Sequence, residues 1–277
     1  MQNAGIAALG LNWRYLAFDV APEQLQPAIE GARTMGFIGL NLTVPHKILA
    51  VPMMDEVDAA ARKWGAVNTI VFEARGVDGE WRPVGQTEPG ARAAVRAHGY
   101  NTDADAIIQA LREEFPLKEL RGAKVLLLGA GGAASAAALR LAEEGIATLW
   151  IVNRTKSKAR ELKDAVLRTF PGFDAREGFP DTAVDLVING TSLGLKAEDP
   201  MPLDAAWLER NRPGRVFDMI YRPRETALLK AARSVGCQTA NGMGMLLHQG
   251  ARALELWTEK RAPVAAMRAA LEANIYV

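Results

Sequence analysis

Residues Val125 to Ala142 read V-L-L-L-G-A-G-G-A-A-S-A-A-A-L-R-L-A and set the architecture of the chain around them. The four apolar residues at the start predict a short strand buried on both faces, and the alanine-rich part predicts a helix. Between them, Gly129, Gly131 and Ala134 follow the order G-x-G-x-x-A, which lets the backbone turn tightly and aim free helix N–H groups at a phosphate. A second apolar run, 149–152, follows at the spacing of a βαβ unit. The sequence therefore predicts a doubly wound α/β domain that binds a dinucleotide.

The end of the second apolar run bears on which dinucleotide is bound. Sites for NAD usually have Asp or Glu here, about 20 residues after the glycines, to bind the ribose 2′-hydroxyl. This chain instead has Asn153, Arg154 and Thr155, followed by Lys156 and Lys158. Cations at this place suit a 2′-phosphate, although a solvated basic loop would carry the same residues. We predict NADP as the cofactor.

Composition bounds the class of protein. The chain has 277 residues, of which 49% are hydrophobic and 23% charged, so it is long enough for two domains with ample cores. Its net charge of +1 implies no nucleic-acid partner. A single cysteine, Cys237, excludes an internal disulfide and a cysteine-rich metal site, and we predict no metal. No apolar run reaches membrane-spanning length and no signal peptide is apparent, so we expect a cytoplasmic protein without a membrane partner.

Hydrophobic periodicity and Gly/Pro punctuation divide the rest of the chain into helices and strands. Helices are predicted at 1–9, 22–35 and 53–64, strands at 15–20, 37–42 and 65–72, and a hairpin turn at Asp78-Gly79. Beyond the glycine turn, strands follow at 184–189 and 216–219, and two helices, 243–257 and 263–273, end the chain. Because these two helices have no strand between them, we expect them to pack on the first domain.

Three polar residues before the glycine turn are candidates for chemistry. Lys47 follows a predicted strand, where a partly desolvated lysine can act as a general acid or base, although a surface lysine at a helix start fits the segment equally well. Asn68 interrupts an apolar strand, so it either caps neighbouring backbone or meets a polar ligand. Asp103 is either a functional carboxylate or the N-cap of the helix that follows.

Eight motifs in register make the chain resemble the shikimate/quinate dehydrogenase family over nearly its whole length. They are N-L-T-V-P-H-K at Asn41, G-A-V-N-T at Gly65, G-Y-N-T-D at Gly99, G-A-G-G-A-A at Gly129, N-R-T at Asn153, N-G-T-S-L-G at Asn189, D-M-I-Y-R-P at Asp218 and N-G-M-G-M-L-L-H-Q-G at Asn241. The resemblance implies reversible, NADP-dependent reduction of 3-dehydroshikimate to shikimate.

The resemblance also implies a role for individual residues. Lys47 and Asp103 would form the catalytic pair. The substrate would be lined by Thr43, Asn68, Tyr221 and Gln249. NADP would be held by Gly129, Ala130, Gly131, Gly132, Ala133, Ala134, Asn153, Arg154, Thr155, Met219 and Gly242. A Rossmann-type NADP domain, 107–239, would be inserted into an open α/β substrate domain made of 1–106 and 240–277, which the C-terminal helices complete.

The sequence departs from the family pattern in three places. Ala104-Asp105-Ala106 stands where glycines usually follow N-T-D, and 75–99 is longer than the usual hairpin. The family's opening strand, with its S-x-S-P substrate-binding serines, is absent before Met1. We therefore expect weak binding of the acid substrate, and either disorder near 1–9 or association through an exposed sheet edge, which would give a homodimer. A start codon assigned too far downstream is the simplest cause.

Two other functions are compatible with the same residues. The pocket could prefer quinate or aminoshikimate as its substrate. Alternatively, the chain could be a catalytically impaired NADP-binding paralogue, because the serines are missing. The presence of Lys47, Asp103 and Gln249 argues against such impairment.

Overall fold

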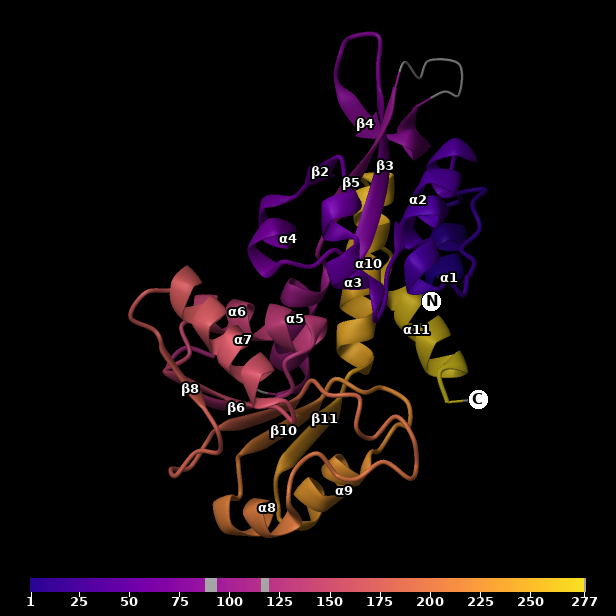
Figure 1. Ribbon diagram of the computed structural model, residues 1–277. Helices are drawn as coiled ribbons and strands as arrows, with labels where there is room; N and C mark the ends of the chain where they lie inside the picture. The colour runs from indigo at the N-terminus through magenta and orange to yellow at the C-terminus, as the bar shows by residue number, and fades with distance from the viewer. Residues whose placement is uncertain (88–93, 116–119, 277) are drawn as a thin grey trace. The chain divides into compact units, whose positions relative to one another are not determined.

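The chain forms two compact units, which the computed structural model describes over residues 1–87, 94–115 and 120–276 (Figure 1). The first unit consists of Met1–Thr102 and Leu247–Glu272, and the second of Asp103–Leu246 and Ala273–Val277. The first unit is therefore discontinuous in sequence.

The second unit contains a six-stranded sheet in which all strands are parallel. In chain order, the strands are β6 (Lys124–Leu128), β7 (Thr148–Val152), β8 (Asp174–Glu177), β9 (Leu186–Asn189), β10 (Arg215–Asp218) and β11 (Gln238–Asn241). Across the sheet the order is β11-β10-β9-β6-β7-β8. Counted within this unit, that is 3-2-1-4-5-6 read from β8, the doubly wound order of dinucleotide-binding domains. The predicted fold class is confirmed, and the point where the strand order reverses lies between β6 and β9.

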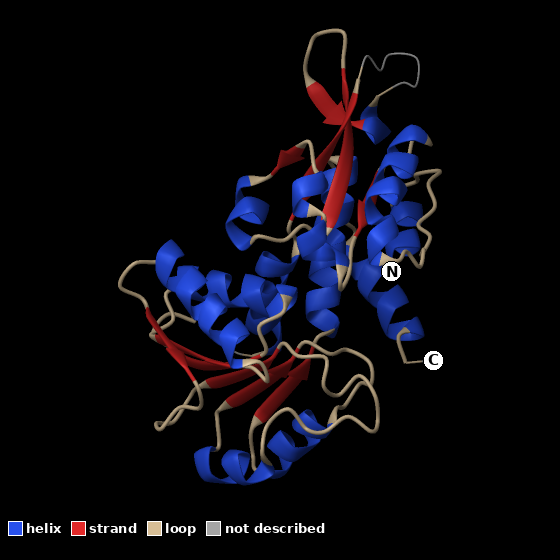
Figure 2. Cartoon of the chain, viewed as in Figure 1, coloured by secondary structure: helices blue, strands red, loops and turns tan. Residues whose placement is uncertain are grey.

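Helices cover both faces of this sheet (Figures 1 and 2). On one face lie α6 (Gly132–Glu143) and α7 (Lys156–Thr169), with α5 (Asp103–Glu114) packed beside α6. On the other lie α8 (Ala205–Asn211) and α9 (Ala227–Ser234), which share a core with the apolar side chains of β6, β9 and β10. The sequence did not predict β8, because its residues D-A-R-E form no apolar run.

The first unit contains a five-stranded mixed sheet. Its strands are β1 (Gly39–Asn41), β2 (Glu56–Val57), β3 (Thr69–Arg75), β4 (Trp81–Pro83) and β5 (Val95–Tyr100). The order is β1-β3-β5-β2, with β4 paired to β3 through the predicted turn at Asp78-Gly79. The central strand β3 is buried on both faces, and its side chains Ile70 and Phe72 pack with α2 (Leu25–Thr34).

The remaining helices of the first unit are short, except for those near the C-terminus. They are α1 (Gln2–Ala8), α3 (His46–Leu49), α4 (Ala59–Trp64), most of α10 (Met243–Thr258) and most of α11 (Val264–Asn274), with 3₁₀ turns at Pro22–Gln24, Val51–Met53 and Val84–Gln86. The indole Nε1 of Trp257 on α10 donates to the carbonyl of Ile70 at 3.0 Å. A Cβ on Gly39 would lie 2.1 Å from that nitrogen, so this close approach requires glycine. α10 thus packs on the N-terminal sheet, and Met267 on α11 lies beside Gly5 on α1, so both C-terminal helices pack on the first unit.

Two predicted elements are wrong. Residues 15–20 form no strand, and Leu16 and Phe18 are mostly exposed, because no neighbouring strand among the described residues pairs with this segment. The helix predicted at 53–64 begins only at Ala59, since Asp58 accepts a hydrogen bond from the N–H of Ala60 at 2.9 Å and caps the helix there. The residues before it pair with β5 as β2.

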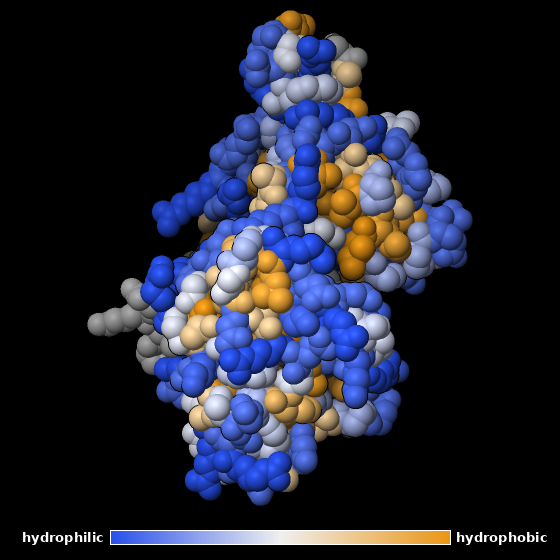
Figure 3. Space-filling view, turned by 60° about the vertical axis from the view of Figure 1, so that its left-hand side comes forward, coloured by the Kyte–Doolittle hydropathy of each residue, from blue (hydrophilic) through white to orange (hydrophobic). Residues whose placement is uncertain are grey.

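The exterior is mostly hydrophilic, with separate hydrophobic areas (Figure 3). Exposed large apolar side chains of the first unit include Leu16, Phe18, Val44 and Ile48. Residues 2–8, near which disorder was one of two expectations, form the regular helix α1. Within the described part of the chain, no helix combines the length and the apolar character needed to span a membrane.

Candidate active site

The turn after β6 has the geometry predicted for a phosphate cradle. Gly129 has a φ of +108°, a conformation that residues with a side chain rarely adopt. A Cβ on Gly129 would lie 2.9 Å from the carbonyl of Gly190, and one on Gly190 would lie 2.9 Å from the Cβ of Ala134. These three small residues bring together the turn after β6, the loop after β9 and the helix α6. The cradle therefore lies at the switch point of the sheet, where such folds bind ligands.

The next two glycines of the turn face open space. Among the described residues, no heavy atom lies within 4 Å of a Cβ built on Gly131 or Gly132. Gly132 begins α6, whose first N–H groups have no partners within the helix. Ala130 and Ala133 are half-buried beside them. The turn thus fits the pyrophosphate of a dinucleotide, which needs both room and free N–H donors.

The loop after β7 carries the predicted cationic residues. The side-chain amide of Asn153 donates to the carbonyl of Thr155 at 2.9 Å, which holds the loop in a turn. The side chain of Arg154 is exposed and forms no ion pair with any residue that the structure describes. Lys156 and Lys158 are exposed in the first turn of α7. A guanidinium in this position suits a 2′-phosphate, because it can form charge-assisted hydrogen bonds with it.

Met219 and Gly242 lie against each other at the ends of β10 and β11. The N–H of Met219 donates to the carbonyl of Asn189 at 2.9 Å, and that of Gly242 to the carbonyl of Ile220 at 3.1 Å. A Cβ on Gly242 would lie 2.0 Å from the carbonyl oxygen of Met219, so only glycine fits. Both residues therefore belong to the edge of the sheet that carries the glycine turn. Tyr221, two residues after Met219, is 39% exposed.

In the first unit, Asn68 joins the beginning of β3 to the end of β5. Its Oδ1 accepts from the N–H of Thr102 at 2.8 Å, and its Nδ2 donates to Thr102 Oγ1 at 3.0 Å. Asn68 is only 1% exposed. The sequence left two roles open for Asn68, binding of neighbouring backbone or of a polar ligand, and the structure shows the hydrogen bond to neighbouring backbone. Thr102 is the last residue of this stretch of the first unit, and the predicted catalytic Asp103, which is buried, begins α5 of the second unit.

Two further polar residues extend this cluster. Asn41 donates from Nδ2 to Thr69 Oγ1 at 3.0 Å, and the hydroxyl of Tyr15 donates to Asn41 Oδ1 at 3.1 Å. Burial raises the pKa of the Tyr15 hydroxyl above its ordinary value. We assigned neither residue from the sequence, because the cluster joins segments far apart in the chain. Asn41 at the start of the N-L-T-V-P-H-K motif was the available signal.

Lys47 lies on α3 beside this cluster. Its carbonyl accepts from the N–H of Val67 at 2.8 Å, which fixes α3 to the residue before Asn68. Its side chain is half-buried, as is that of Gln249 on α10, whereas Thr43 is exposed. His46 donates from Nε2 to the carbonyl of Val20 at 2.9 Å, which agrees with a structural role for this histidine.

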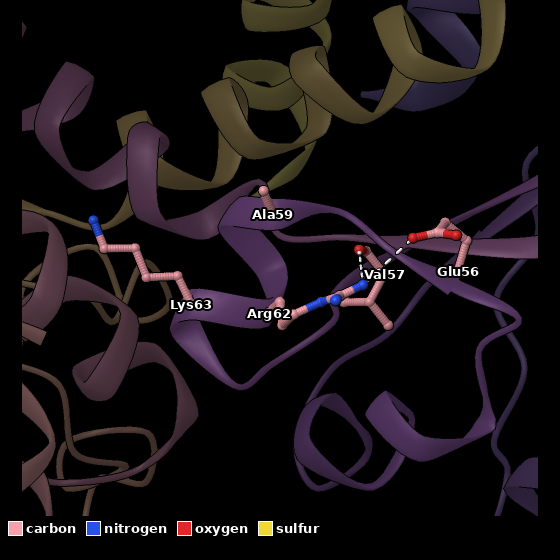
Figure 4. A pocket seen from close by; sticks show the side chains of 5 residues that line it. All are labelled: Glu56, Val57, Ala59, Arg62 and Lys63. Carbon is pink, nitrogen blue, oxygen red and sulfur yellow. Dashed lines mark hydrogen bonds and ion pairs between the residues drawn. The ribbon is translucent and has the colours of Figure 1, made fainter.

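A surface cavity of about 510 Å³ also lies in the first unit, on β2 and α4 (Figure 4). It is lined by Glu56, Val57, Ala59, Arg62 and Lys63. The guanidinium of Arg62 already contacts Glu56 Oε1 at 3.4 Å and the carbonyl of Val57 at 3.2 Å (Figure 4). No predicted site residue lines the cavity, and we assign it no ligand. Among the described residues, no cluster of three or more His, Cys, Asp or Glu side chains could hold a metal ion.

Three family models match the chain in succession. Residues 1–70 match the shikimate dehydrogenase substrate binding domain, residues 110–177 match shikimate/quinate 5-dehydrogenase, and residues 242–272 match the shikimate 5′-dehydrogenase C-terminal domain. The motifs quoted above lie both within and between these matches.

Known proteins give the same result. The NADP⁺-dependent shikimate dehydrogenase of Moorella thermoacetica is 41% identical over 96% of this chain and 85% of its own. A shikimate dehydrogenase solved with NADP⁺ is 35% identical, with a TM-score of 0.82 over 99% of this chain and 89% of that one. The Thermus thermophilus enzyme, solved with NADP(H) and shikimate, is 31% identical, with a TM-score of 0.79 over 98% and 92%. The chain belongs to the shikimate/quinate dehydrogenase family.

Proposed function

We propose that the protein interconverts 3-dehydroshikimate and shikimate with NADP as its cofactor. The observation that carries this proposal is the glycine cradle at the switch point of the second unit, followed by the exposed Arg154, in a chain 41% identical to an NADP⁺-dependent shikimate dehydrogenase. The cradle supplies a dinucleotide site, and the family membership supplies the substrate class.

We assign cofactor binding to the second unit, which contains the predicted domain 107–239 and also Gly242. The bound cofactor would supply hydride transfer, with NADP⁺ as the acceptor during oxidation of shikimate and NADPH as the donor during reduction of the ketone. Gly131 and Gly132 leave the backbone open to the pyrophosphate, and the first N–H groups of α6 donate to it. Arg154 binds the 2′-phosphate that NAD lacks. Met219 and Gly242 border the ring end of the site, at the next strands of the same edge.

We assign proton transfer to Lys47, assisted by Asp103, in the substrate domain formed by 1–106 and 240–277. Lys47 takes the proton from the hydroxyl of shikimate that is oxidised, as the hydride leaves the carbon that bears this hydroxyl. During reduction of the ketone, Lys47 returns a proton to the oxygen. Asp103 provides the negative charge that orients the lysine. Thr43, Asn68, Tyr221 and Gln249 contact the substrate in this proposal, which follows from the family motifs.

The state of assembly completes the proposal. The exposed apolar side chains of the first unit, among them Leu16 and Phe18, would be covered in a homodimer. The net charge of +1 gives no reason to expect a nucleic-acid partner. Light scattering coupled to size exclusion should give twice the mass of the chain. A single-chain mass at micromolar concentration would contradict the dimer. The cytoplasmic location stays a prediction.

Transfer of an isotope label tests the proposed reaction. Shikimate deuterated at the carbon that carries the oxidised hydroxyl is incubated with the protein and NADP⁺, and both products are analysed by mass spectrometry. We expect unlabelled 3-dehydroshikimate and NADPH that carries one deuterium. The specificity constant should be higher for shikimate than for quinate or aminoshikimate. Tight NADP binding without label transfer from any of these substrates would instead support the impaired paralogue.

A further inference from the structure

The last residues of β9, β10 and β11 form a polar row across the sheet of the second unit. Asp218 is in register with Asn189 on one side and with Asn241 on the other. Earlier residues on this face, such as Val187 and Val216, belong to the apolar core under α8 and α9. Asp218 is 0% exposed, so a carboxylate at this place needs hydrogen-bond donors.

The carboxylate of Asp218 receives three hydrogen bonds from three segments of the chain. Its Oδ1 accepts from Asn189 Nδ2 at 2.9 Å and from the N–H of Ile220 at 3.0 Å, and its Oδ2 accepts from Thr226 Oγ1 at 2.6 Å. Burial raises the pKa of Asp218, and these three donors act in the opposite direction. The donors come from the end of β9, from the loop after β10 and from the residue that caps α9.

These donors hold the two ends of one loop, residues 219–225. Ile220 lies at its beginning, and Thr226 follows its end, where the hydroxyl also accepts from the N–H of Leu229 at 3.4 Å. Asn189 in turn accepts from the N–H of Thr191 at 3.0 Å, which fixes the neighbouring loop after β9. One buried carboxylate thus ties together both loops at this edge. The loop 219–225 contains Met219 and Tyr221.

We propose that Asp218 is a positioning residue for hydride transfer, which holds the loop 219–225 so that Met219 and Tyr221 meet the bound ligands. The inference rests on the proposed function, which assigns Met219 to NADP and Tyr221 to the substrate. Asp218 itself is buried beneath the loop, and in this proposal it contacts neither NADP nor the substrate. A purely structural carboxylate would stabilise the sheet without affecting reaction geometry, and the test separates these roles.

The variants Asp218→Asn, Thr226→Val and Thr226→Ser form the test, with Asp174→Asn on β8 as the matched control at the far edge of the same sheet. Asp218→Asn keeps the shape but removes the charge, Thr226→Val removes one donor, and Thr226→Ser restores the hydroxyl.

For Asp218→Asn and Thr226→Val, we expect faster amide hydrogen exchange in 219–226 of the free protein. We also expect kcat to fall about tenfold or more, because small misplacements of reacting groups slow catalysis strongly. The KM for shikimate and the Kd for NADP should change less than kcat. Thr226→Ser and Asp174→Asn should resemble the wild type.

Two results would overturn the inference. One is a lower melting temperature for Asp218→Asn and Thr226→Val with unchanged loop exchange and kcat, which would make Asp218 structural only. The other is a kcat loss that Thr226→Ser shares with Thr226→Val. If the wild type itself does not turn over shikimate, the proposed function fails. The exchange data and the NADP titration then still show whether Asp218 orders the loop and the cofactor site.

Discussion

The two regions that carry predicted site residues, one in each unit, are built in different ways. The edge of the second unit that carries Gly129, Gly131 and Gly242 is shaped by backbone, and small residues are required there because other atoms lie too close or because a ligand needs room. The cluster around Asn68 in the first unit is shaped by side-chain hydrogen bonds among Tyr15, Asn41, Asn68 and Thr102.

This difference decides what each region tolerates. A site made of backbone fails when volume is added, since a new Cβ has nowhere to go or blocks the ligand. A site made of side-chain hydrogen bonds fails when an atom is removed, since a buried donor or acceptor then lacks its partner. Substitutions that add volume in one unit and remove atoms in the other therefore distinguish the two.

The largest effect is expected at Lys47 in the first unit. Lys47→Met should lower kcat by about 10²- to 10⁴-fold, because proton transfer loses its side chain. The Kd for NADP, measured by fluorescence titration, should stay at the wild-type value. Lys63→Met, on α4 in the same unit, serves as the control and should leave kcat unchanged. Near-native turnover by a folded Lys47→Met would remove Lys47 from the mechanism.

Adding volume to the cradle should give the next largest effect. Gly131→Val should weaken NADP binding about a hundredfold, or roughly 2.7 kcal/mol, because the side chain fills the space meant for the pyrophosphate. The free protein should lose only about 1 kcal/mol of stability, since an added Cβ meets no described atom within 4 Å and valine is merely a poor N-cap. Gly242→Ala should instead destabilise the free protein markedly, as its Cβ would meet Met219. Unchanged NADP affinity in Gly131→Val would contradict the assigned site.

Arg154 sharpens the assignment of NADP over NAD. Arg154→Ala should weaken NADP binding by about ten- to a hundredfold, the value of a hydrogen bond to a charged group, and leave the affinity for NAD unchanged. Arg168→Ala, in the last turn of α7, the helix that follows this loop, is the matched control. Equal losses for both cofactors would mean that Arg154 acts on the fold and not on the 2′-phosphate.

Removing atoms from the cluster in the first unit should lower stability. Asn68→Ala leaves the buried N–H and hydroxyl of Thr102 without their partner, so the free energy of unfolding in urea should fall by about 2–3 kcal/mol. Asn101→Ala removes an amide that donates to the carbonyl of Ala66 at 2.9 Å and should lower it by about 1 kcal/mol. If Asn68→Ala is no less stable than Asn101→Ala, the cluster does not hold the unit together.

The smallest effect concerns Glu73, away from the predicted site. Burial would raise its pKa, but hydrogen bonds from His98 and Arg96 outweigh burial and hold the pKa below its ordinary value of 4.5. A carboxylate with a lowered pKa stabilises the folded protein at pH values above its ordinary pKa. This stabilisation is lost as the pH falls through the lowered pKa. Glu73→Gln should therefore lose about 1–2 kcal/mol at pH 7 and approach the wild type in acid. A difference independent of pH would assign the effect to packing.

The same contrast explains which features were predictable from sequence. Strands β6, β9 and β10 are short apolar runs, and the glycine turn has few possible sequences. Both could therefore be predicted from the residues of each segment alone. By contrast, β2 has only two residues and depends on β5 for its existence. Thr102, the partner of Asn68, and Asn189, one of the partners of Asp218, come from distant segments, and a pattern read along the chain does not pair them. Asn189 and Asp218 each end an apolar strand, and these polar residues were the sequence signal for the polar row.

The most direct test of the account is a pair of titrations, NADP and shikimate separately, into the wild type, Lys47→Met and Gly131→Val, with kcat measured alongside. The account predicts a crossed result. Lys47→Met should keep its affinity for NADP while losing turnover, and Gly131→Val should keep its affinity for shikimate while losing NADP binding. Loss of both affinities in either folded variant would contradict the claim that Lys47 acts in proton transfer and Gly131 in NADP binding.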